Sequence, residues 1–193
     1  MEDLYEYLDE QAAYIAQSSA YSYCRARTGF MAPKLFAEAE FVVNLDRSKW
    51  ATYLAVLEDL LITLEWEMRG WGLAPEALHA GLCDVYNGIL SGRPRPPERE
   101  EPWPKADDGF ARRLAQSQMA APKTTGELSQ HSGKVLFNTV PIHPDMKNID
   151  EEMVVNSVRF RLLRFAEELP ARLDAAALRI AMGAAPDSRA GQA

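Results

Sequence analysis

The amino-acid sequence predicts an all-α protein, a helical bundle of about six helices with a proline-rich connector and one short extended segment. Apolar residues recur at the three- and four-residue spacing of amphipathic helices through most of the chain. Five of the 12 prolines lie within residues 91–109, so the helix-breaking residues are concentrated in one place. No unit of roughly 20–50 residues repeats along the sequence, which excludes a solenoid.

The length and composition are those of one globular domain. The chain has 193 residues, of which 47% are hydrophobic and 25% are charged. A chain of this length buries roughly 70% of the surface that it exposes when unfolded, so its core needs no metal or disulfide. We expect a single helical domain over residues 1–183, with helical clusters at 3–90 and 110–182 joined by a linker at 91–109. The tail 184–193 has no apolar periodicity and is expected to be disordered.

The first half of the chain predicts four helices. A long helix over 3–27 follows from apolar and small residues at helical spacing, with no proline or glycine within it. A short helix is expected at 33–45, and Ser48 is then placed to cap a helix at about 49–70. The next helix covers 74–90 and has a proline near its start.

The helix at 49–70 has the strongest periodicity in the chain and is apolar on two sides. Its main face carries large apolar residues: Trp50, Tyr53, Leu54, Leu57, Leu60, Leu61, Leu64, Met68 and Trp71. At about 100° per residue, a second and narrower strip lies on the far side. This strip consists of Ala51, Ala55, Ile62 and Trp66. A helix with two apolar sides is either central in a bundle or shared with a partner molecule.

The chain after the linker is less regular. Residues 110–119 predict a short helix, and Thr124 to Glu127 match a capping box that opens one brief turn. Residues 134–142 (KVLFNTVPI) are rich in β-branched and aromatic types and predict an isolated strand. A lone strand leaves its backbone groups unpaired, and the sequence shows no partner for it.

The last long helix is predicted at about 150–169. Its N-cap is Asn148 or Asp150, because both side chains are of the type that accepts a hydrogen bond at a helix start. Pro170 interrupts or restarts this helix, which continues to Gly183.

Charge is distributed unevenly. Residues 1–20 carry five acidic residues and no Lys or Arg, whereas arginines outnumber acids within 156–182. We therefore expect the first and last helices to lie side by side with complementary charges. The net charge of −7 disfavours binding to nucleic acid. The acidic start and the absence of a long uninterrupted apolar run predict neither a secretory leader nor a membrane span, and hence a cytoplasmic location.

No complete catalytic or metal-binding motif is present in the sequence. Glu76 and His79 have the ExxH spacing of di-iron helical bundles, but such sites need this pair twice and it occurs once. Cys24 and Cys83 are far apart and are expected to be buried thiols. The sequence therefore predicts no metal and no cofactor, and it favours a protein that is not an enzyme.

The end of the first helix joins aromatic rings to cations. Tyr21, Tyr23, Arg25 and Arg27 are candidates for binding an anion or a protein partner, because arginine forms paired hydrogen bonds to carboxylate and phosphate. The alternative is structural: the arginines complement the negative end of the helix while the tyrosines pack.

Apolar side chains outside the core faces are candidates for an interface. They are Ile62 and Trp66 on the second strip, Trp103 in the linker, and Phe160 with Met153 on the last long helix. Trp103 is expected to pin the linker either onto the body or onto another protein. A monomer has difficulty covering such surface. The sequence therefore favours a non-enzymatic interaction protein, an adaptor or assembly factor, which binds a protein partner and self-associates as a homo-oligomer.

The alternative function is a helical-bundle ligand-binding protein or metal-dependent enzyme. Its pocket would lie between helices, near Glu76 and His79 or near Arg25 and Arg27. Residues distant in sequence can assemble such a site, so the lack of a local motif leaves this alternative open.

Overall fold

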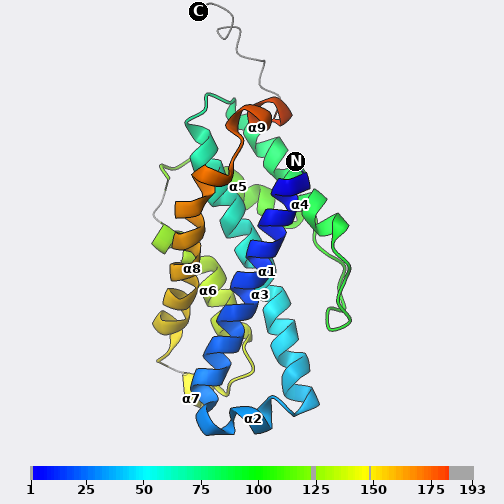
Figure 1. The fold of residues 1–193 in the computed structure, drawn as a ribbon, viewed down its shortest axis with the longest axis vertical. Helices are drawn as coiled ribbons and strands as arrows, with labels where there is room; N and C mark the ends of the chain where they lie inside the picture. The colour runs from blue at the N-terminus through cyan, green and yellow to red at the C-terminus, as the bar shows by residue number, and fades with distance from the viewer. Residues whose placement is uncertain (1, 123–124, 148, 183–193) are drawn as a thin grey trace, which may run out of the picture.

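The computed structural model describes residues 2–122, 125–147 and 149–182 (Figure 1). Its helices are α1 (Glu2–Thr28), α2 (Ala32–Leu35), α3 (Ala39–Arg69), α4 (Pro75–Gly92), α5 (Phe110–Gln118), α6 (Thr125–Thr139), α7 (Pro144–Lys147), α8 (Glu151–Arg172) and α9 (Ala175–Ala181), with 3₁₀ turns at Gly29–Met31 and Ala106–Asp108. The described residues contain no strand, so the predicted all-α bundle is confirmed. Among the same residues, no helix combines the length and hydropathy needed to cross a membrane.

Helix α3 is the centre of the bundle. It contacts α1, α4, α5, α6 and α8. Both of its apolar sides are buried, with Leu60 and Leu64 on the main face and Ala55 and Ile62 on the second strip. Of the two explanations for a helix with two apolar sides, the central position is therefore the one that applies to α3.

The helix boundary predicted at Ser48 is wrong, because α3 is continuous over 31 residues. It begins after Glu38, whose backbone is extended. The Ser48 Oγ lies 2.8 Å from the Thr139 Oγ1 at the end of α6. A serine whose hydroxyl bonds to a neighbouring helix is tolerated inside a helix and has no need to cap one. The short helix expected at 33–45 is thus α2 and the first turns of α3.

The strand predicted at 134–142 is also wrong, because this segment belongs largely to helix α6. Leu128, Leu136 and Val140 are buried and lie at multiples of four residues, which is a helical period. The helix packs against α8 and α3. A helix satisfies its own backbone groups, so no strand partner is needed, and packing overrides the β-propensity of valine and threonine.

The interruption or restart predicted at Pro170 is wrong, because helix α8 continues through this proline and ends at Arg172. The proline removes one backbone donor close to the end of the helix, where few further bonds depend on it. A new helix, α9, begins only after Asp174, whose carboxylate accepts a hydrogen bond of 3.0 Å from the main-chain N–H of Ala177. Three segments discussed above lie outside the described residues: Thr124, Asn148 and the tail 184–193.

The proline-rich linker is anchored to the bundle. Residues 93–105 run without regular structure from the end of α4 and form the green loop beside it (Figure 1). The Trp103 Nε1 donates a hydrogen bond of 2.9 Å to the main-chain oxygen of Arg93. Its ring centre lies 5.9 Å from that of Trp50 and 5.7 Å from that of Tyr53. Of the two roles expected for Trp103, the structure shows the first, since it pins the linker onto the body of the same chain.

Helices α1 and α8 are in contact, as expected, and Arg172 at the end of α8 lies over the Tyr7 ring of α1. The rings of Tyr7 and Phe165 stack with their centres 5.8 Å apart. An ion pair of 3.0 Å joins Arg27 of α1 to Asp150, the residue before α8, so its signs are opposite to the prediction. The acidic Asp9 of α1 pairs instead with an arginine of the linker. Ring stacking and an ion pair of reversed sign are thus among the contacts that hold these two helices together.

Candidate functional site

Tyr23 and Arg27 point into the protein and meet at Asp150. The Tyr23 hydroxyl donates a hydrogen bond of 2.9 Å to the Asp150 Oδ2, and the Arg27 Nε lies 3.0 Å from the same oxygen. Arg27 also donates to the main-chain oxygen of Met146. Burial, and then the bond to Asp150, raise the pKa of Tyr23. Asp150 occupies the N-cap position of α8 as predicted, but its carboxylate caps no main-chain N–H there, because these two side chains use it.

Tyr21 and Arg25 face outward. They line a pocket of about 380 Å³ together with Phe30 and Phe36. The ring centres of Tyr21 and Phe36 are 4.8 Å apart. The four residues predicted as one site therefore divide into an inward pair, which joins α1 to α8, and an outward pair beside α2.

Three of the predicted interface residues make contacts within the chain. Ile62 is only 2% exposed and belongs to the core. Trp66 is half-buried, and its Nε1 donates a hydrogen bond of 3.1 Å to the Ser117 Oγ of α5. Trp103 packs on the body as described above. These positions correct the prediction, because other helices of the same chain cover the second apolar strip of α3.

The outer face of α8 carries exposed apolar side chains. Met153, Phe160 and Leu163 are exposed, and Phe160 is exposed to 69%. With the half-buried Asn156, they follow one another at steps of three, four and three residues, and we call these four residues the outer stripe. The exposed Ile149, in the turn before α8, lies four residues before Met153. The sequence analysis named Met153 and Phe160. The same spacing identifies Asn156 and Leu163, which the sequence analysis missed.

A cluster of buried charges holds α5 and α6 against α3. The fully buried Asp59 accepts hydrogen bonds from Arg113 and, at 3.3 Å, from the main-chain N–H of Ser132. Arg113 also lies 3.2 Å from Glu58, whose carboxylate is 3.2 Å from the His131 Nε2. Burial raises the pKa of Asp59, although Arg113 and His131 oppose the shift. The sequence showed these acids only as breaks in an apolar run. Their partners are supplied within the chain, so we assign the cluster to packing.

Glu76 and His79 do not form half of a metal site. The His79 Nε2 donates a hydrogen bond of 2.9 Å to the main-chain oxygen of Ala111, while Glu76 is exposed. The His79 Nδ1 lies 3.9 Å from the Cys83 Sγ. Burial, and then two neighbouring aspartates, raise the pKa of Cys83 and keep it a thiol. Over the described ranges, no three His, Cys, Asp or Glu side chains are grouped so that they could hold a metal ion.

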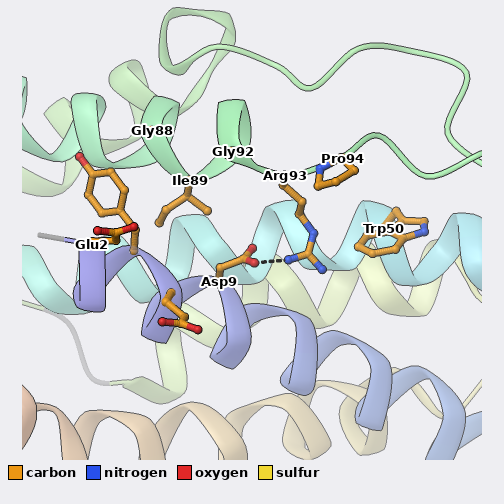
Figure 2. Close-up of a pocket in the computed structure, with 10 residues that line it drawn as sticks. Glu2, Asp9, Trp50, Gly88, Ile89, Gly92, Arg93 and Pro94 are labelled. Atoms are coloured by element: carbon orange, nitrogen blue, oxygen red, sulfur yellow. Dashed lines mark hydrogen bonds and ion pairs between the residues drawn. The ribbon is translucent and has the colours of Figure 1, made fainter.

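A hollow of about 620 Å³ opens between α1 and the end of α4 (Figure 2). We call it the acidic hollow, because Glu2, Glu6 and Asp9 line it and Arg93 is the one cation among the described residues of its lining. Figure 2 shows the ion pair between Arg93 and Asp9. The Arg93 guanidinium also lies 5.1 Å from the ring centre of Trp50. Arg93 is thus fixed between α1, α3 and the linker.

A second hollow, of about 680 Å³, shares Arg93 with the first. We call it the basic hollow, because its charged lining residues are Arg93, Arg95 and Lys105, with no carboxylate among the described residues that line it. Its other lining residues are Asn87, Leu90, Ser91, Pro102, Trp103 and Pro104. Two hollows of opposite charge therefore meet at one arginine.

The fold and these surfaces define a class of protein: an all-α helical bundle with an exposed apolar stripe and two charged hollows. Comparison of the chain with family models, with curated proteins and with solved structures finds no match. The side chains on these surfaces are therefore the basis for assigning a function.

Proposed function

We propose that this protein is a non-enzymatic interaction protein that pairs with a second copy of itself through the outer stripe of α8. The observation that supports this proposal is the exposure of Met153, Phe160 and Leu163 along one face of a 22-residue helix. Large apolar side chains grouped on an exposed face are typical of interaction surfaces. The opposite face of α8 supplies the core, so the stripe is not needed for the fold.

The spacing of the outer stripe fits a second helix. Alternating steps of three and four residues are those of the a and d positions of a heptad, whose seam packs against a partner helix. Asn156 occupies one of these positions. A polar residue in such a seam fixes the register and the number of helices at some cost in stability. At 1.5 Å per residue, the outer stripe from Met153 to Leu163 is roughly 15 Å long.

The charges along α8 favour a second copy that runs antiparallel. The first turn carries Glu151 and Glu152, and Arg161 and Arg164 follow near the middle of the helix, where Arg164 also pairs with Glu168 at 2.8 Å. A two-fold axis near Val158 places Met153 opposite Leu163 of the second copy and brings Glu152 to the level of Arg164. A parallel copy would align acids with acids. An isologous antiparallel pair is therefore the arrangement that we propose.

The test of self-association is the molecular mass in solution. Sedimentation equilibrium over a range of concentrations is expected to show a monomer–dimer equilibrium. Phe160→Lys is expected to raise the dissociation constant about tenfold or more, because it places a charge in the seam. Phe30→Lys is the matched control, since Phe30 is 92% exposed and lies outside α8. It should leave the equilibrium unchanged.

Two results would contradict self-association: a monomer at every concentration, or equal effects of the two substitutions. Crosslinking tests the orientation. A Met153→Cys chain is mixed with a Leu163→Cys chain, both also carrying Cys83→Ser because Cys83 is partly exposed. A bis-maleimide should join the two different chains if the helices are antiparallel. Crosslinking of each chain mainly to its own kind would indicate a parallel pair.

A further inference from the structure

We propose that the basic hollow binds a small organic anion with two or more negative charges, of the phosphate or polycarboxylate class. Its volume of about 680 Å³ is that of pockets that hold small molecules. It lies over the end of α4 and the linker, on a different part of the bundle from α8 (Figure 1). The inference therefore does not depend on self-association.

Among the described residues, the cationic groups of Arg95 and Lys105 form no ion pair, although the Asp108 carboxylate accepts a hydrogen bond of 2.7 Å from the main-chain N–H of Lys105. Arg95 donates a hydrogen bond of 3.0 Å to the main-chain oxygen of Glu100, which satisfies a donor and leaves the charge in place. Within the part of the chain that the structure describes, no ion pair joins Arg95 or Lys105 to a carboxylate. The whole chain has a net charge of −7, so this concentration of cations needs a reason. A bound anion removes their mutual repulsion.

Three acids of the linker do not line the basic hollow. Glu98, Glu100 and Glu101 line a separate hollow of about 240 Å³ together with Arg47. The carboxylate of Glu100 lies 3.3 Å from the Arg47 guanidinium. Glu100 is thus paired with an arginine of α3, and these three acids, together with Arg99, line a different hollow from Arg93, Arg95 and Lys105.

The negative end of α4 does not account for these cations. A helix C-terminus carries roughly half a negative charge. Three cations line the basic hollow. One of them, Arg93, is already paired with Asp9. The helix end therefore balances at most a part of the charge of Arg95 and Lys105.

Two hydrogen bonds hold the chain around the basic hollow in place, and neither of them uses the charged groups of Arg95 or Lys105. The Trp103 Nε1 donates to the main-chain oxygen of Arg93 at 2.9 Å. The main-chain N–H of Ala106 donates to the Asn87 Oδ1 at 2.9 Å. These bonds tie both ends of the linker to the end of α4. A site whose frame is already ordered loses less conformational entropy when a ligand binds.

The lining residues indicate the chemistry of the ligand. Arginine forms paired hydrogen bonds to planar carboxylates and to phosphates, and lysine adds a point charge. Leu90, Pro102 and Pro104 give the hollow apolar walls. The arrangement suits a compact anion with a small hydrocarbon portion.

Isothermal titration calorimetry tests the site with two probes, inorganic pyrophosphate for the phosphate class and citrate for the carboxylate class. We expect at least one of them to bind the wild-type protein, with an affinity that falls as ionic strength rises. The double variant Arg95→Gln, Lys105→Gln should bind it about tenfold more weakly or worse. The matched control is Lys34→Gln, Arg112→Gln, which removes the same charge at two exposed positions outside the hollow. It should bind as the wild type does.

The outcomes separate the sources of the ligand. Binding of pyrophosphate alone supports an organic phosphate, and binding of citrate alone supports a polycarboxylate. Failure of the wild type to bind either probe overturns the proposal, as does an equal loss in the two double variants. Arg95 and Lys105 are exposed, so the substitutions leave the core intact. Circular dichroism checks that both double variants are folded.

Discussion

The inner and outer faces of α8 carry the same kinds of side chain in opposite surroundings. On the inner face, Phe165 is 1% exposed and stacks on Tyr7. On the outer face, five residues earlier, Phe160 is 69% exposed. Helices α1 and α6 pack against the inner face, whereas no helix of the described residues covers Phe160. The comparison shows that neighbouring elements, and not residue type, decide which apolar residues build the core.

Helix α3 leads to the same conclusion, because its second apolar side is covered where that of α8 is exposed. It too has apolar residues on two sides, but its second strip is covered, and Ile62 is buried. Other helices surround α3, while α8 lies at the edge of the bundle (Figure 1). A two-sided apolar pattern thus has two meanings, a central helix or an exposed surface, and the position in the bundle distinguishes them.

The largest expected effect is the contrast between the two phenylalanines of α8. Phe165→Ala should lower the free energy of unfolding by about 3–5 kcal/mol, because it leaves a cavity and removes the stacking on Tyr7. Phe160→Ala should lower it by about 0.5 kcal/mol or less, because the side chain is already in contact with water. Urea unfolding followed by circular dichroism, at concentrations where the protein is monomeric, measures both. Equal losses of unfolding free energy in the two variants would show that the inner and outer faces of α8 do not differ in burial as described.

A smaller effect is expected at Gly133, where α6 meets the inner face of α8. A Cβ added there would lie 2.8 Å from the Cα of Val155. Because backbone atoms cannot turn aside as a flexible side chain does, Gly133→Ala should cost about 1–3 kcal/mol despite the better helix propensity of alanine. Gly92→Ala is the control, since nothing lies within 4 Å of its added Cβ. Equal stabilities of the two variants would show that the helices pack less closely than described.

The sequence correctly predicted the helices that have a clear apolar periodicity and whose ends do not depend on tertiary contacts. The ranges 3–27, 74–90 and 110–119 agree with α1, α4 and α5 to within about two residues, which is the normal uncertainty of a helix end. The errors at Ser48 and at 134–142 have one cause. At both places tertiary contacts between α3, α6 and α8 decide the structure, and no local propensity encodes those contacts.

The candidate surfaces were predicted less well. Tyr21 and Tyr23 were grouped because they are close in sequence, although at 100° per residue they lie on opposite sides of a helix. The same angle places Arg25 with Tyr21 and Arg27 with Tyr23, as the structure shows. The basic hollow was missed for another reason. Its cations come from both ends of an irregular proline-rich segment, where no periodicity relates one residue to another.

The smallest expected effect concerns the polar end of the inner face, where Tyr23 donates to Asp150. Tyr23→Phe should cost about 1 kcal/mol near neutral pH, because one hydrogen bond is lost while Arg27 stays paired with Asp150. Burial and this bond raise the pKa of Tyr23 above the usual value of about 10. The folded protein therefore keeps the proton at a pH where the unfolded chain loses it.

The stabilisation by Tyr23 is thus complete below about pH 10 and is lost as the pH rises further. Urea unfolding of the wild type and of Tyr23→Phe at about pH 8 and about pH 10.5 measures this change. The difference between the two proteins should shrink at the higher pH, and other tyrosines cancel because both proteins contain them. A constant difference would mean that Tyr23 ionises as easily in the folded protein as in the unfolded chain, and a growing one that it ionises more easily in the folded protein. The contact between α1 and the start of α8 would then be open to water, and the inner face of α8 would be less closed at this end than at Phe165.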